Sequence, residues 1–126
     1  MDKKNGRRAT PGRVRTVKPF GDADNMAVDL LELSDGEQAA ILDRHGYMPG
    51  RKDATAAKLN KVTRDTVLKR ITGWDDYTAD GAPVEVNDKA KLDFLIEMYV
   101  VDSEEKSLWQ LCVEAEQRQK EDEEKN

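Results

Sequence analysis

The sequence has few of the residues that build catalytic and metal sites. It contains one cysteine, Cys112, and one histidine, His45, 67 positions apart. A structural zinc ion needs about four His, Cys or carboxylate ligands at suitable spacing, so we expect no zinc site. A single cysteine cannot form a disulfide within the chain, which favours a reducing compartment.

Long apolar runs are also absent. No run of about 18 apolar residues occurs, so we expect no membrane-spanning segment. The basic start, MDKKNGRRATPGR, contains no apolar stretch of the kind that secretory signals carry. Together these absences predict a protein of the cytoplasm.

Charge is plentiful and unevenly distributed. Charged residues make up 37% of the chain, and the net charge is −5. Residues 1–18 carry a net charge of +6, whereas residues 102–126 carry −5. The uneven charge has two explanations, contact with a partner or solvated chain ends. We expect a disordered basic arm at 1–12, a single helix-rich domain at 13–115 and an acidic C-terminal tail at 116–126, either as a solvated helix end or as disordered chain.

The first part of this domain has the pattern of two strands. RVRTVKPF (13–20) and MAVDLLEL (26–33) place apolar and polar residues alternately, and GDADN (21–25) has turn chemistry between them. This arrangement predicts a β-hairpin.

Four helices are expected after the hairpin. Ser34 and Glu37 have capping-box spacing, which predicts a helix at 35–45 that ends at Gly46, with Ala40, Ile41 and Ala39 as its inward residues. A second helix is expected from Asp53 to Gly73. A third should start at Asn87 or Asp88, and a fourth at Asp102 or Ser103. The apolar stripes of the last three are Leu59, Val62, Thr66, Val67 and Ile71; Leu92, Leu95, Ile96 and Tyr99; and Leu108, Leu111, Cys112 and Ala115. The predicted fold class is therefore α+β, mainly α-helical, with an N-terminal β-hairpin packed on about four helices and with flexible termini.

The stretch ITGWDDYTADGAPVEV (71–86) is the best candidate for a loop with chemistry. Asp76, Thr78 and Asp80 resemble the first ligands of a calcium loop. Asn87 stands where the bidentate glutamate should be, and Pro83 interrupts the loop, so the calcium interpretation fails. A structural elbow between two helices, anchored by Trp74, fits better. We therefore predict no metal, no cofactor and no catalytic residue, and a protein that is not an enzyme.

Four apolar residues are the candidates for partner binding. Phe94, Met98 and Trp109 fall outside the expected helical stripes, and Trp74 lies at the expected elbow. Methionine and aromatic residues are typical of adaptable interfaces. The alternative is that these residues only extend the core.

Three segments together resemble the tail assembly chaperones of long-tailed bacteriophages. They are LELSDGEQAAI (31–41), VLKRITGWDDYTADGAPVEV (67–86) and NDKAKLDFLIEMY (87–99). The resemblance covers about residues 14–101 and consists of a Leu-Ser-Asp helix start, a Gly-Trp-Asp element, an Asp-Gly-x-Pro turn and a polar helix cap. These are short structural elements, with no catalytic signature among them.

The resemblance implies a non-enzymatic role in the host cell cytoplasm. Such chaperones bind the tape measure protein, keep it soluble and help to recruit tail tube protein, and they are absent from the mature virion. Self-association stays open as a further interaction. Two other functions also stay open: a small virion structural protein, such as a head–tail connector or completion subunit, and a nucleic-acid-binding module that uses the basic arm. The acidic body of the chain makes nucleic acid the less favoured partner.

Overall fold

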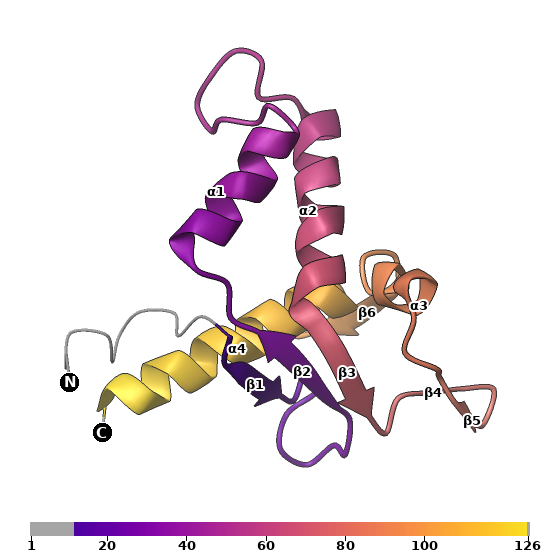
Figure 1. The fold of residues 1–126 in the computed structure, drawn as a ribbon. Helices are drawn as coiled ribbons and strands as arrows, with labels where there is room; N and C mark the ends of the chain where they lie inside the picture. Colours follow the sequence, from indigo (N-terminus) through magenta and orange to yellow (C-terminus); the bar gives the residue numbers. More distant parts are fainter. Residues whose placement is uncertain (1–11, 126) are drawn as a thin grey trace.

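The computed structural model describes residues 12–125, in which helices and small antiparallel sheets are mixed (Figure 1). In chain order the elements are β1 (Val14–Val17), β2 (Ala27–Leu31), α1 (Asp35–Arg44), α2 (Ala56–Arg70), β3 (Ile71–Asp75), β4 (Thr78–Ala79), β5 (Ala82–Pro83), α3 (Asp88–Asp93), β6 (Met98–Val101), β7 (Glu104–Ser107) and α4 (Leu108–Lys125). The mixed α+β class is confirmed. The predicted basic arm, apart from Gly12, lies outside the described residues, as does Asn126.

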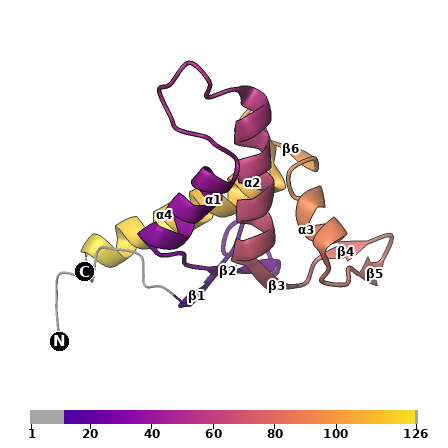
Figure 2. The same cartoon turned by 45° about the horizontal axis from the view of Figure 1, so that its top comes forward.

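The helices are arranged around α2. In both views α1 lies on one side of α2, whereas α3 and the β4–β5 hairpin lie on the other (Figure 1 and Figure 2). The long helix α4 passes behind α2, from near β6 at its start to near β1 at its end. Contacts of α4 with β1 and β7 hold it in this position.

The predicted N-terminal hairpin is confirmed. β1 and β2 pair antiparallel, with Val17 opposite Val28, and both of these valines are fully buried. In β2 the predicted apolar face is the buried one, because Val28 and Leu30 both point inward. In β1 the burial also alternates, but Arg15 is buried and Val14 is 49% exposed, so the apolar and polar residues there do not mark the inner and outer faces. A third strand, β3, pairs with β2 and was not predicted.

Helix α1 begins and ends where the sequence predicts. Ser34 and Glu37 form both bonds of the capping box, and Gly46 follows the helix with a φ of 61°. This left-handed conformation suits glycine, which has no Cβ to clash. Ile41 is buried, but the expectation that Ala39 and Ala40 face inward is wrong, because both are exposed.

Helix α2 departs from the prediction at both ends. Its N-cap is Thr55 rather than Asp53, and the Thr55 side chain accepts a hydrogen bond from the N–H of Lys58. The helix ends at Arg70, and the chain continues directly into β3, so Gly73 lies inside a strand. The predicted elbow between two helices is therefore wrong. Its Asp80-Gly81 turn is real, and it joins β4 to β5.

The expected third helix is shorter than predicted and is followed by a turn and a hairpin. α3 is capped by Asn87, as predicted, but contains only six residues. The chain then forms the hairpin β6–β7, in which Asp102 and Ser103 make the turn instead of capping the fourth helix. Both turn residues have positive φ, 52° and 67°, which matches the twist of a two-residue hairpin loop.

Helix α4 buries the predicted stripe of Leu108, Leu111, Cys112 and Ala115. It then continues to Lys125, so residues 116–125 are a helix end, one of the two forms that the sequence left open. Glu116 at the start of this part is 5% exposed, whereas residues 121–125 are exposed, so the last turns form a solvated helix end.

Candidate partner-binding surface

Trp74 and Phe94, two of the four predicted partner residues, lie together in an aromatic cluster. Their rings stack with centroids 5.3 Å apart, and Tyr77 packs edge-on against both. The Trp74 Nε1–H donates to the carbonyl oxygen of Val84 at 2.9 Å, so its polar end is satisfied. Phe94 is fully buried, and the expectation that it lies on the surface is wrong. This cluster fastens β3 to the segment after α3, as a core contact does.

Trp109, the third predicted residue, is half-buried in the first turn of α4. The Arg70 guanidinium carbon lies 6.0 Å from the centre of its ring, a cation–π arrangement. Trp109 also lines a groove of about 350 Å³ between α1, α2 and α4. The other lining residues are Leu33, Gln38, Ile41, Leu42, Val62, Thr66, Arg70 and Val113.

Met98, the fourth predicted residue, belongs to an exposed apolar row. Ile96, Met98 and Val100 are 73%, 48% and 76% exposed. Alternate residues of a strand point to one face, so Met98 and Val100 share one face of β6, and Ile96 lies in the turn just before the strand. We call these three exposed residues the β6 row (Ile96, Met98, Val100). The residues between them, Glu97 and Tyr99, are partly buried. Grouped exposed apolar side chains are typical of an interaction site.

The backbone of β6 is also open on one side. β6 pairs with β7 alone, with Val101 opposite Glu104 and Tyr99 opposite Lys106. In an antiparallel pair, alternate residues bond to the neighbouring strand, and in a two-residue hairpin the first bonded pair closes the turn. The bonded residues are therefore Val101 and Tyr99, whereas the N–H and C=O of Met98 and Val100 point away from β7. Among residues 12–125, no backbone hydrogen bond links this outer edge to another element.

The surroundings of the β6 row are acidic. Glu105 lies directly opposite Val100 on the same face of the hairpin, and Asp102 lies in its turn. Glu104 lies 3.7 Å from the Lys106 ammonium, which also binds Glu114 at 3.0 Å. The hydrogen bond to Glu114 raises the pKa of Lys106, which therefore stays charged.

Cys112 and His45, the one cysteine and the one histidine of the sequence, both make contacts that stabilise the fold. Cys112 is fully buried, as its place on the apolar stripe predicts, and burial raises the pKa of its thiol to about 12. His45 caps the end of α1, where its Nε2 lies 2.5 Å from the Asp65 carboxylate. This hydrogen bond is the main reason that the pKa of Asp65 is lowered.

No cluster of metal-ligating residues occurs within residues 12–125. None of the helices in that range combines the length and the apolarity needed to cross a bilayer.

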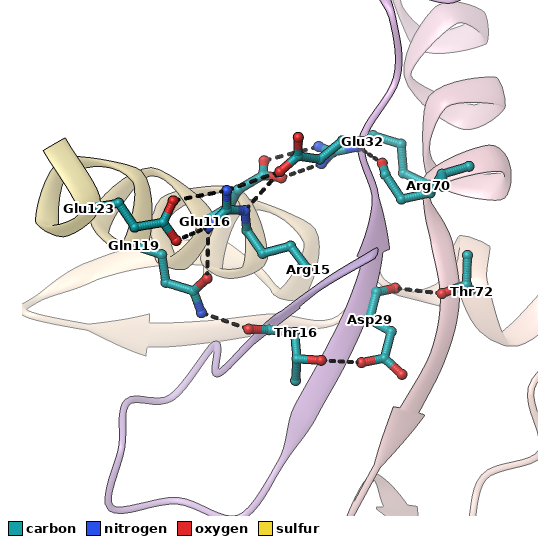
Figure 3. A network of polar contacts seen from close by, with 10 residues as sticks. Arg15, Thr16, Asp29, Glu32, Arg70, Thr72, Glu116, Gln119 and Glu123 are labelled. Atoms are coloured by element: carbon teal, nitrogen blue, oxygen red, sulfur yellow. Dashed lines mark hydrogen bonds and ion pairs between the residues drawn. The ribbon is translucent and has the colours of Figure 1, made fainter. Parts of the chain in front are cut away.

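A network of charged side chains fastens the end of α4 to the sheet (Figure 3). Arg15 of β1 donates to Glu32 at 3.1 Å and to Glu123 at 2.6 Å. Arg70 at the end of α2 donates to the carbonyl oxygen of Leu31 and forms an ion pair with Glu116. In these contacts each arginine is paired with a carboxylate of the same molecule, so the network stabilises the fold.

Sequence reasoning therefore found one residue of the exposed surface and missed its neighbours. Met98 was selected, but Ile96 was assigned to an inward helical stripe, and Val100 was not selected. A usable signal exists in IEMYV (96–100), where Ile96, Met98 and Val100 are spaced by two, the period of a strand. The overlapping helical spacing of Leu92, Leu95 and Ile96 concealed it.

No protein-family profile matches this sequence. No solved structure matches the chain.

Proposed function

We propose that this protein is a non-enzymatic tail assembly chaperone of a long-tailed bacteriophage. It binds the tape measure protein through the β6 row, keeps it soluble and helps to recruit tail tube protein in the host cytoplasm. The observation that carries the binding role is the row itself, two exposed apolar side chains on the strand β6 and a third, Ile96, in the turn just before it. The identity of the client rests on the resemblance of residues 14–101 to this family.

The chemistry of the surface suits a protein that holds an aggregation-prone client. Removing apolar area from water is the main favourable term in most protein association. Ile96 and Val100 expose about three quarters of their side chains, which a client could cover. The net charge of −5 would help to keep the complex soluble.

A nucleic-acid-binding role has less support. It depends on the basic residues near the start of the chain, yet Arg15 is 6% exposed and neutralised by Glu32 and Glu123. A side chain that is buried in ion pairs cannot also neutralise a phosphate. The described part of the basic segment is therefore a poorer phosphate site than the sequence suggests.

Co-expression with the tape measure protein of the same phage tests the proposal. The measurement is the fraction of tape measure protein that stays soluble and co-purifies with the chaperone. We expect rescue by the wild type and loss of rescue by Met98→Asp, because a buried carboxylate in the interface would be costly. If the wild type neither rescues nor co-purifies with the client, the chaperone proposal is wrong.

Met48→Asp is the matched control. Met48 is a methionine of similar exposure, 52% against 48%, in the segment between α1 and α2. It should retain full rescue, and urea unfolding should show that both variants are folded. Detection of the protein in purified virions would instead favour a structural subunit.

A further inference from the structure

We propose that the outer edge of β6 takes up its partner as an added β-strand. The partner segment is extended and alternates aliphatic residues with lysine or arginine. This inference rests on the proposed function only for the location of the surface. It adds the conformation and the chemical class of the segment that binds there.

The backbone of β6 provides the first argument. The N–H and C=O groups of Met98 and Val100 point outward, so two donors and two acceptors are aligned along one edge. An exposed edge of this kind is a ready template for another strand. A helix lying on the side chains would leave these four groups unused.

The side chains provide the second argument. Met98 and Val100 of the β6 row lie on one face of the strand, and an added strand would place every second side chain beside them. Aliphatic residues at those positions would extend the apolar row and remove it from water. The partner must therefore be apolar with a period of two.

Charge selects the partner further. The segment 97–107 contains four carboxylates, Glu97, Asp102, Glu104 and Glu105, and one cation, Lys106. A partner strand with lysine or arginine between its aliphatic residues complements this excess of negative charge. A second copy of this chain fits less well. Each copy carries the same excess of negative charge on this hairpin, so pairing two β6 strands would bring like charges together.

A short synthetic peptide of alternating lysine and valine is the probe. We expect it to bind the full-length protein, and a peptide with glutamate in place of lysine to fail. Hydrogen exchange read by NMR should slow by about tenfold or more at the amides of Met98 and Val100. The amides of Tyr99 and Val101, which already bond to β7, should change little. If the peptide binds but hydrogen exchange does not slow at alternate amides along β6, strand addition is wrong.

Val100→Pro separates the backbone from the side chain. Proline removes the outward N–H and is tolerated at edge strands, because the bonds to β7 come from other residues. We expect it to weaken peptide binding by about fivefold to tenfold, whereas Val100→Ala, which keeps the N–H, should weaken it less. The lysine–valine peptide with N-methylated amides tests the same bonds without a change in the protein. It should bind the wild type as weakly as the unmodified peptide binds Val100→Pro.

The outcomes distinguish this inference from the proposed function. If Met98→Asp abolishes capture of tape measure protein but Val100→Pro binds client and peptide normally, the client lies on the side chains. Strand addition is then wrong, and the chaperone proposal stands. If the lysine–valine peptide binds with alternating protection but tape measure protein is never captured, strand addition stands and the client assignment is wrong. Protection of the Met98 and Val100 amides in the free protein that grows with its concentration would show self-pairing and overturn the partner proposed here.

Discussion

Met98 and Phe94 are four positions apart in the chain, and their environments are opposite. The sequence pattern predicts the same role, partner binding, for both residues, since both fall outside the expected helical stripe. In the structure Phe94 is fully buried against Trp74 and Tyr77, whereas the Met98 side chain is about half exposed on β6. Substitutions at these two residues should therefore change different properties of the protein.

Phe94→Ala should lower the free energy of unfolding by about 3–5 kcal/mol, because it leaves a cavity in the core. Met98→Ala should change it by only about 0.5 kcal/mol, as surface substitutions do, while weakening partner binding. Urea unfolding followed by tryptophan fluorescence measures the first effect. Equal destabilisation by the two substitutions would contradict the assignment of Phe94 to the core and Met98 to the surface.

Ser103 offers a stabilising substitution. Its φ of 67° is unfavourable for a residue with a Cβ and easily adopted by glycine. Ser103→Gly should raise the free energy of unfolding by up to about 1 kcal/mol, since Asp-Gly is a preferred loop for this turn. Thermal unfolding measures the change. Glu105→Gly, placed in the extended strand β7, is the control and should have the opposite sign.

At the scale of elements, sequence patterns correctly predicted those helices and strands that contacts between nearby residues determine. The capping box of Ser34 and Glu37 set the start of α1 correctly, because both of its bonds lie within four residues. The hairpin β1–β2 was found from its alternating residues. The strand β6 was missed, since the residues around it have both a helical and a strand spacing, and the pairing of Met98–Val101 with β7 decides between them. The strand β3 was missed for the same reason, because its partner β2 is about forty residues away.

The same limit applies to the candidate surface. Whether Met98 or Phe94 is exposed depends on how the aromatic cluster and α4 pack, and no spacing within residues 87–99 contains that information. The contact of Arg15 with Glu123 joins residues 108 positions apart. A sequence pattern shows that such charges exist but cannot show that they meet.

The connection between β1 and α4 depends on Arg15, which also contacts the buried Glu32. Arg15→Met keeps the length of the side chain and removes its charge. We expect the free energy of unfolding to fall by about 3 kcal/mol, because a buried ion pair loses one member. Arg13→Met, at an exposed position just before β1, is the control and should be nearly neutral. A similar loss in both variants would show that general charge, not this contact, stabilises the fold.

At the scale of the whole molecule, the basic beginning and the acidic end of the chain partly neutralise each other. Arg15 binds Glu123, and the Gln119 side-chain amide donates to the carbonyl oxygen of Thr16 at 2.6 Å. The uneven charge, which suggested contact with a partner, therefore has an explanation within the molecule for these residues. The acidic segment 97–107 has no comparable basic cover among the described residues beyond Lys106, which directs the search for a partner to the β6–β7 hairpin.

Acid should weaken the attachment of the end of α4. The hydrogen bond from Arg15 lowers the pKa of Glu123 below its ordinary value of about 4.3. A lowered carboxyl pKa means that the contact stabilises the fold fully above the ordinary pKa and is lost as the pH falls through the lowered one. A titration of the Glu123 carboxyl ¹³C shift should therefore have a midpoint below that of an ordinary glutamate. In Arg15→Met the midpoint should rise toward the ordinary value. Glu37, whose pKa is lowered mainly by the backbone N–H of Ser34, is the internal control and should not move. An ordinary midpoint for Glu123 in the wild type would show that α4 is not held by Arg15 in solution.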